Sequence, residues 1–288
     1  MSNQQSAPTG RSLSKSIAVG LLLGGAFLLS VLIYKELFMV LAAAAAGFGA
    51  WELSTALRIK GWYVPRVPSV IGAILIMPAT FFGGAEAQWL TSLATVAALI
   101  IWRAAHVLWE RRQAPIQAFR NTVRDFAAAA FVVIYLPLMT SFAILLLRRP
   151  NDGAIWVIAF VVTVSMIDTA GYLVGRKLGK HQMAPGVSPK KSIEGLIASI
   201  VAGSVSSMLF IVFGLHGPWW LGLFFAAVML LAAVFGDLAE SLIKRDLGVK
   251  DMSSLLPGHG GVMDRMDSIL PASLIAYLFA SIFFPIAQ

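Results

Sequence analysis

The sequence SLIKRDLGVKDMSSLLPGHGGVMDRMD, residues 241–267, is a polar stretch that links two long apolar runs, residues 219–243 and 268–286. Each run is close to the ~20 residues that an α-helix needs to cross the hydrocarbon core of a bilayer. A connection between two such helices only needs to be polar, yet this one contains a Gly-Gly pair together with several acidic and basic residues. We therefore expect two membrane helices joined by a segment with a function of its own.

The composition of the whole chain is typical of a membrane protein. Of its 288 residues, 58% are hydrophobic and 12% are charged, whereas soluble domains are near half apolar and a quarter charged. The absence of cysteine excludes disulfides, thiolate nucleophiles and cysteine-ligated metals. The formal net charge is +8, but the basic residues fall in short connections between apolar runs. This pattern indicates a lipid bilayer as the partner and no nucleic acid.

Nine apolar runs predict an all-α, polytopic integral membrane protein with about nine transmembrane helices. The runs are residues 17–34, 37–57, 67–84, 88–109, 126–147, 154–175, 193–214, 219–243 and 268–286. Only Lys35 and Glu36 separate the first two, so one long broken helix is the main alternative to this count. Residues 1–16 are polar without an apolar period, which predicts a disordered cytoplasmic tail.

Lysine and arginine predict the orientation, because cytoplasmic loops retain these residues. With the N-terminus inside, 18 of the 22 lysines and arginines fall in inner segments and three in outer segments, while Arg103 lies within a helix. We therefore expect a cytoplasmic N-terminus, with residues 241–267 on the cytoplasmic side of the cell inner (plasma) membrane.

Polar residues also mark the end of the run 219–243. Asp237, Glu240, Ser241 and Lys244 recur at i, i+3, i+4 and i+7, which places them along one helical face. Eighteen residues precede Asp237 in this run, roughly 27 Å of helix at ~1.5 Å per residue, so Asp237 should lie near the inner border. A solvated helix end with an ion pair is the alternative reading.

Asp264 and Asp267 lie at the predicted start of the last helix, where the helix dipole favours negative charge. Capping alone could account for one of them. Pro271 has no N–H for the Asp267 carbonyl, which could leave that oxygen to water or an ion, or it could simply occupy the first helical turn. Mg²⁺ typically takes one or two carboxylates together with substrate phosphates and waters, so Asp237 and Asp264 are the first candidate ligands.

The turn before the last helix is a candidate anion site. Gly260 and Gly261 allow backbone N–H groups to approach a phosphate at a helix start. His259 has no cysteine and no nearby histidine for a zinc site. It would therefore bond a phosphate or carboxylate, or stabilise the turn.

Two further polar positions precede this region. In SPKKSIEG, residues 188–195, we expect Ser188 to cap a helix with proline at its first position, while Lys190 and Lys191 add positive charge. Asp168 lies about 14 residues into an inward-running helix, roughly 21 Å along it. A carboxylate at that depth is a functional candidate, with a structural hydrogen-bond anchor as the alternative.

Residues 241–267 closely resemble the signature of the CDP-diacylglycerol synthases, also called phosphatidate cytidylyltransferases. The agreeing positions are Ser241, Lys244, Arg245, Lys250, Asp251, Pro257, His259, Gly260, Gly261, Asp264, Arg265 and Asp267. Residues 188–192 are similar to the Ser-Pro-x-Lys-Thr segment of that family, with Ser192 in place of threonine, and residues 168–172 are similar to a third segment. The N-terminal half matches only as a string of helices.

The resemblance implies transfer of a cytidylyl group from CTP to phosphatidate, which gives CDP-diacylglycerol and pyrophosphate. It also implies a homodimer and a site for Mg²⁺, with a second, monovalent ion such as K⁺. Residues 17–147 would be N-terminal membrane helices and residues 148–288 the catalytic region. The attacking phosphate of the lipid is already ionised near neutral pH, so we assign no catalytic base. Such a transfer depends on alignment and charge neutralisation.

The residues then receive expected roles. The metal would be held by Asp237, Asp264, Asp267 and Glu240. Groups that act on the reacting phosphates would be Lys244, Arg245, Asp251, His259, Arg265 and Lys191. Substrates would be bound by Ser188, Lys190, Ser192, Ser241, Gly260, Gly261 and Asp168.

Three other functions are weighed against this one. A membrane enzyme that uses CTP to phosphorylate a lipid alcohol would share the helices but not the full stretch 241–267. A CDP-alcohol phosphotransferase would need Asp-Gly and paired-Asp spacing, which we do not find. A transporter would have its carboxylates near the membrane midplane on discontinuous helices, whereas these gather at one border.

Overall fold

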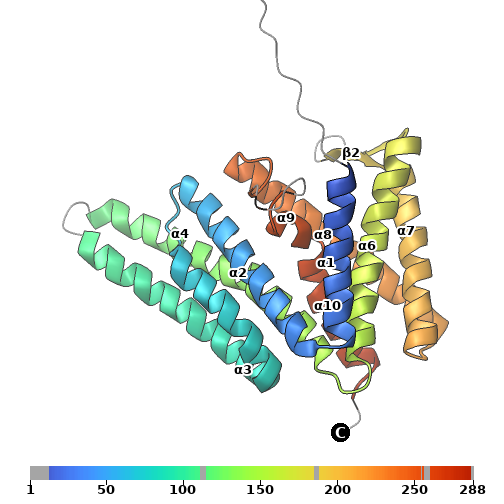
Figure 1. Cartoon of the computed structure of the whole chain (residues 1–288). Coiled ribbons are helices and arrows are strands. Elements are labelled where there is room, and N and C mark those ends of the chain that lie inside the picture. Colours follow the sequence, from blue (N-terminus) through green and yellow to red (C-terminus); the bar gives the residue numbers. More distant parts are fainter. Residues whose placement is uncertain (1–12, 111–114, 185–187, 254, 256–259, 287–288) are drawn as a thin grey trace, which may run out of the picture.

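The computed structural model describes residues 13–110, 115–184, 188–253, 255 and 260–286, and most of them are helical (Figure 1). The elements are α1 (Leu13–Leu32), α2 (Lys35–Ile59), α3 (Arg66–Glu110), α4 (Pro115–Val133), the π-helix η1 (Ile134–Leu138), α5 (Met139–Leu147), α6 (Gly153–Leu178), β1 (Gln182–Ala184), β2 (Ser188–Ser192), α7 (Ile193–Met208), the π-helix η2 (Leu209–Gly214), α8 (Trp219–Leu247), α9 (Met263–Met266) and α10 (Ile269–Phe283). The disordered tail predicted for residues 1–16 falls largely outside the described residues.

Seven helices in the described part of the chain are long and apolar enough to cross a membrane. They are Lys35–Ile59, Arg66–Trp109, Asn121–Leu147, Gly153–Leu178, Ile193–Gly214, Trp219–Leu247 and Met263–Phe283. This confirms an all-α multi-pass membrane protein. The first predicted run lies in α1, which ends at Leu32 before α2 begins at Lys35, so the first two runs are two helices and not one.

Two of the nine predicted runs lie within α3. Gly84 interrupts this helix with φ 74° and ψ −156°, a backbone conformation that glycine tolerates. A Cβ atom on Gly72 would lie 2.1 Å from the Thr95 side chain, so residues on either side of Gly84 face each other. The two parts of α3 therefore fold back on each other at Gly84 as two packed helices (Figure 1). The number of membrane crossings and the cytoplasmic N-terminus stay predictions.

Helices α5 to α10 are joined by small and hydroxylated residues. Ser199 of α7 donates its hydroxyl to the carbonyl of Ile167 in α6, and Ser207 of α7 donates to that of Gly222 in α8. In α10, Ser273 donates to the carbonyl of Met139 in α5. Such contacts let membrane helices approach closely, where apolar burial alone gives little preference between helices.

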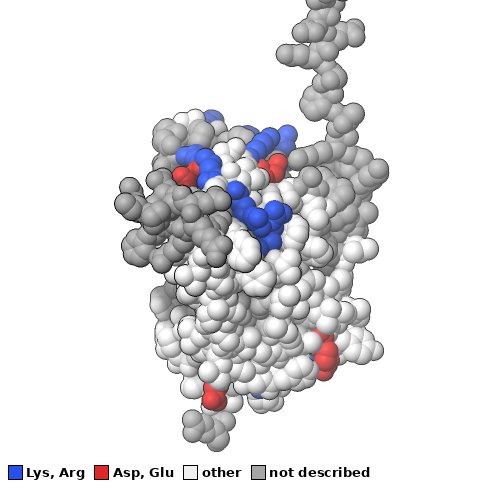
Figure 2. Space-filling view, turned by 90° about the vertical axis from the view of Figure 1, so that its left-hand side faces the viewer, with Lys and Arg blue, Asp and Glu red and all other residues white. Residues whose placement is uncertain are grey.

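Charged side chains on the surface lie toward the ends of the helices and not along their middle (Figure 2). In the face drawn in Figure 2, lysine and arginine side chains gather toward the upper end, and the middle of the molecule is white. On this face the arrangement is the one expected of a membrane protein with a basic border at that end. The end of α2, the start of α3 and the region around α9 lie at the corresponding end in Figure 1.

Candidate active site

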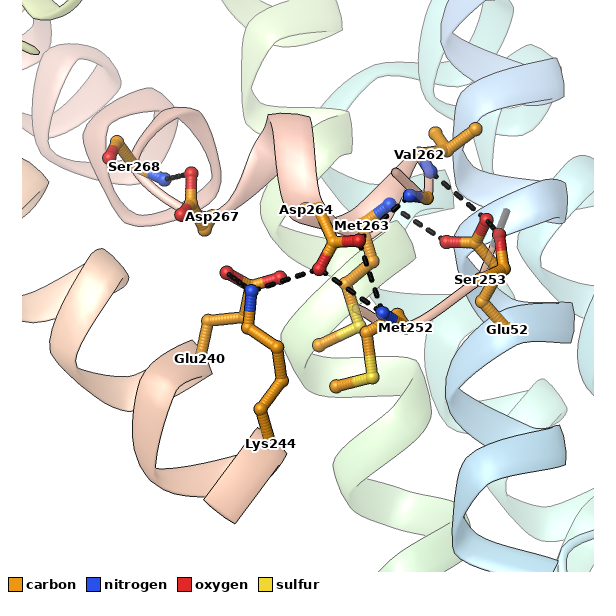
Figure 3. Close-up of polar contacts among 11 residues, drawn as sticks. Glu52, Glu240, Lys244, Met252, Ser253, Val262, Met263, Asp264, Asp267 and Ser268 are labelled. Atoms are coloured by element: carbon orange, nitrogen blue, oxygen red, sulfur yellow. Dashed lines mark hydrogen bonds and ion pairs between the residues drawn. The ribbon is translucent and has the colours of Figure 1, made fainter. Parts of the chain in front are cut away.

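Acidic side chains from two separate helices meet at one ammonium group (Figure 3). Nζ of Lys244 in α8 lies 2.9 Å from Oε2 of Glu240 and 2.9 Å from Oδ1 of Asp264 in α9. The Glu240 and Asp264 side chains are 1% and 4% exposed. Because an unpaired buried charge is costly, the ammonium group beside these carboxylates stabilises negative charge on them.

The predicted face of α8 is therefore observed for Glu240 and Lys244, which form an i,i+4 ion pair. Ser241 and Asp237, on the same helix, are half-buried. Asp237 interacts electrostatically with Asp267, as does Glu240. The end of α8 and the α9–α10 junction thus share one acidic site.

Gly236 allows this close approach of α8. A Cβ atom at this position would lie 2.2 Å from the carbonyl oxygen of Asp267 and 3.0 Å from the ring of Pro271. The Asp267 carbonyl therefore packs against Gly236, and Pro271 occupies the first turn of α10. That position agrees with the alternative reading of Pro271, and an ion at the Asp267 carbonyl stays a prediction.

The glycine turn surrounds the Asp264 carboxylate. The N–H of Gly261 donates to Oδ2 at 2.7 Å, and the N–H of Met252 donates to the same atom at 3.1 Å. Gly260 has φ 84°, and a Cβ there would lie 2.8 Å from Oδ2. In this structure the turn binds a carboxylate of the protein itself, so its expected contact with a substrate phosphate stays a prediction.

Glu52 of α2, which the sequence analysis did not single out, binds the other side of the same segment. Its carboxylate accepts hydrogen bonds from the N–H groups of Val262 (3.0 Å) and Met263 (2.9 Å) and from the hydroxyl of Ser253. The side chain is buried, at 4% exposure. A lone carboxylate in an apolar run was the signal that could have identified it, since such residues are costly in membranes.

Tyr135 of η1 is a second residue missed from the sequence. It lies close enough to Glu240 and Asp267 to interact with them electrostatically, and its hydroxyl is buried without a hydrogen-bond partner in the described part of the chain. Single-turn π-helices often occur at functional sites. No sequence signal distinguishes this tyrosine from a packing residue.

The structure of residues 188–195 differs from the prediction for this segment. Ser188 does not cap a helix, because residues 188–192 form strand β2, which pairs antiparallel with β1. Ser192 is the N-cap of α7 instead, and its hydroxyl accepts the N–H of Gly195 at 3.1 Å. The extended pairing of β2 moves the helix start by four residues, so a hydroxyl at Ser192 takes the role expected of Ser188.

The remaining predicted residues are placed as follows. Three of them are exposed on the elements that form the acidic site or on the connection between these elements. Arg245 lies on α8, Asp251 on the α8–α9 connection and Arg265 on α9. Asp168 is exposed on α6, and its role stays a prediction. His259 and Pro257 lie outside the described residues, and so do the side chains of Ser188, Lys190 and Lys191.

The donor set suits a hard divalent cation. In the described residues no three histidine or acidic side chains are grouped as metal ligands, and the ammonium of Lys244 lies where a cation between Glu240 and Asp264 would lie. Oε1 of Glu240 is buried without a hydrogen-bond partner. With all groups ionised, Glu240, Asp264, Asp267 and Lys244 leave two negative charges, and carboxylate oxygens are the ligands that Mg²⁺ prefers. The chemistry of these carboxylates therefore fits Mg²⁺, and in this structure the ammonium of Lys244 holds the position between Glu240 and Asp264.

Comparison with known proteins identifies the family of the chain. The model of the cytidylyltransferase family matches residues 14–283. A phosphatidate cytidylyltransferase of Mycobacterium leprae (strain TN) is 36% identical over 283 residues, covering 96% of this chain and 90% of that protein. The phosphatidate cytidylyltransferase of Bacillus subtilis (strain 168) is 28% identical, covering 94% of this chain and 98% of that protein. The chain therefore belongs to the cytidylyltransferase family.

Proposed function

We propose that this protein transfers the cytidylyl group of CTP to phosphatidate, forming CDP-diacylglycerol and pyrophosphate in phospholipid biosynthesis. The observation that carries the proposal is the meeting of Glu240 and Asp264 from two helices at one cation, at the end of a set of membrane helices. A phosphoryl-type transfer needs charge neutralisation and alignment more than covalent catalysis, and this site offers both.

In the reaction, an oxygen of the ionised lipid phosphate attacks the α-phosphorus of CTP, and the bond to the β-phosphate breaks as pyrophosphate leaves. Asp264 and Asp237 would hold Mg²⁺, supported by Asp267 and Glu240, and the ion when bound neutralises charge on the CTP phosphates. A second, monovalent ion such as K⁺ would share the site.

Basic and backbone groups would bind the phosphates of the two substrates. Lys244 and Arg245 at the end of α8, with Arg265 of α9, lie on the elements that form the acidic site. The ammonium of Lys244 would leave the carboxylates for a phosphate oxygen. Lys191, Asp251 and His259 would also act on the reacting phosphates. The remaining proposed substrate contacts are Ser188, Lys190, Ser192, Ser241, Asp168 and the glycine turn.

The site would face the cytoplasm, where CTP is present, from the inner membrane. The basic border in Figure 2 supports this orientation, because cytoplasmic segments retain lysine and arginine. Phosphatidate would keep its acyl chains in the bilayer while its headgroup reaches the acidic site. We also propose a homodimer.

The test is turnover by the purified protein in detergent with CTP, phosphatidate and Mg²⁺, with dCTP and ATP as comparisons. We expect one pyrophosphate for each lipid converted, and label from the α-phosphate of CTP in the lipid. Label from the γ-phosphate in the lipid would instead identify a CTP-dependent lipid kinase and refute the proposal.

A further inference from the structure

A pocket of about 320 Å³ lies on α2 and α3, outside the acidic site. Its wall contains Arg58, Arg66, Trp51, Tyr63 and Trp102, and no acidic residue lines it. Trp51 and Arg58 are seven residues apart on α2 and so share one face, about 100° around the helix from Glu52. The pocket and the segment that Glu52 binds therefore lie on different faces of α2.

Both arginines of the pocket are placed over aromatic rings. The guanidinium carbon of Arg66 lies 5.3 Å from the ring centre of Trp51, and that of Arg58 lies 5.5 Å from the ring centre of Tyr63. Stacking uses the face of a guanidinium and leaves its N–H groups in the plane for an oxyanion. Among the described residues neither arginine has a carboxylate partner.

A buried ion pair holds the pocket wall in place. Arg103 of α3 and Asp125 of α4 lie 2.8 Å apart, with side chains 7% and 1% exposed. Asp125 also accepts the N–H of Tyr63 at 2.9 Å, and Arg103 lies 4.5 Å from the Tyr63 ring centre. The ring of His106 stacks on the same tyrosine at 4.6 Å. Tyr63 is thus fixed from three sides before any ligand arrives, which lowers the entropic cost of binding.

The position of the pocket indicates what it binds. It lies at the end of α2, toward the same end of the molecule as the region around α9 (Figure 1). At a membrane border, phospholipid headgroups would meet the helices there. Exposed Trp102 and Val67 give the rim an apolar side toward the bilayer. A basic residue that only sets topology needs no aromatic support, and Lys60 beside the pocket has none among the ring contacts of the described residues.

We infer that this pocket binds the phosphate of an anionic glycerophospholipid, with Arg58 and Arg66 as the phosphate ligands and the aromatic rim against the acyl chains. Basic pockets between membrane helices at a cytoplasmic border are suited to such headgroups. This lipid is distinct from the one being converted, because no residue that lines the pocket belongs to the acidic site. The inference does not depend on cytidylyl transfer.

The test uses the full chain in detergent, freed of lipid, with native mass spectrometry to count bound phosphatidylglycerol or phosphatidylcholine of the same acyl chains. We expect wild-type protein to retain one phosphatidylglycerol in preference to phosphatidylcholine. Arg58→Gln together with Arg66→Gln should weaken phosphatidylglycerol binding roughly 25-fold, about fivefold for each arginine. Binding of phosphatidylcholine should not change.

The control is Lys60→Gln, which removes one positive charge at the same border outside the pocket lining and is matched to Arg58→Gln alone. Equal losses in the control and in the double variant would overturn the inference. Displacement of phosphatidylglycerol by soluble glycerol 3-phosphate at equal concentration would overturn the lipid assignment and leave a site for free phosphate. If the double variant does not fold, Arg58→Gln alone is the test, because Arg58 is exposed and its replacement should leave the fold intact. An unchanged affinity of Arg58→Gln for phosphatidylglycerol would overturn the inference as well.

Discussion

Replacing Glu52 by glutamine should slow the reaction although Glu52 belongs to a helix of the N-terminal half. The carboxylate accepts the N–H groups of Val262 and Met263 with different oxygens. An amide has one oxygen, so its NH₂ group must face one of these N–H donors. A hydrogen bond to a charged group contributes about 1.5–3 kcal/mol, and the loss of one leaves a buried donor unpaired.

The lost hydrogen bond should displace the part of residues 252–264 that positions Asp264. Turnover should then decrease about 10-fold to 150-fold, since ~1.4 kcal/mol is a factor of ten. Asp264 is the residue affected, because Met252 and Gly261 of the same segment bind its carboxylate. The assay is steady-state pyrophosphate release, with kcat measured at saturating CTP and phosphatidate. Glu52→Asp keeps the charge and should restore part of the rate.

The matched control is Glu36→Gln, which makes the same change at an exposed position of α2. It should leave kcat within about twofold of wild type. A lowered melting temperature with unchanged kcat in Glu52→Gln would mean that Glu52 only stabilises the fold. An unchanged kcat and melting temperature would refute the reasoning altogether.

Three further predictions concern the acidic site and its orientation. Asp264→Asn should abolish turnover while the protein stays folded, as judged by monodispersity and thermal unfolding; near-normal rates would contradict its assigned role. Gly236→Ala should destabilise the protein by about 1–3 kcal/mol through overpacking against the Asp267 carbonyl and should reduce turnover, whereas Gly24→Ala, with open space around it, should not. Because the chain has no cysteine, Lys250→Cys and Lys35→Cys give clean labelling sites: in intact cells a membrane-impermeant maleimide should label Lys35→Cys alone, and labelling of Lys250→Cys would reverse the proposed orientation.

Local sequence patterns predicted the features that depend on a single helix, namely its position in the chain and which residues share one of its faces. The spacing of Glu240 and Lys244 predicted a shared face, and the ion pair forms there. The apolar runs predicted the helices, including two that lie within α3. The exception is local too: the Ser-Pro-Lys-Lys segment looked like a helix start, yet it pairs as a strand with residues 182–184. Strand pairing depends on a partner segment, which helix-capping rules do not consider.

Contacts between distant helices could not be predicted in this way. Helical periodicity shows which face of a helix is polar but not which helix lies opposite. Glu52 is more than 200 positions from the N–H groups it binds, and the close approach of Gly236 to Asp267 depends on how α8 crosses α10. The bonding of Lys244 to Asp264 has the same origin. Each is a tertiary contact between residues that have no local relation.

Helix α2 gives the N-terminal half a definite role in the site. In the sequence this half resembled the family only as a string of helices, yet one face of α2 holds the turn that binds Asp264, through Glu52. The face that carries Trp51 and Arg58 forms part of the wall of the pocket on α2 and α3 that contains Arg58 and Arg66. A ligand that changed the position of α2 would therefore act on the Asp264 segment through three hydrogen bonds to one carboxylate. Glu52→Gln should weaken that connection while leaving the pocket itself intact.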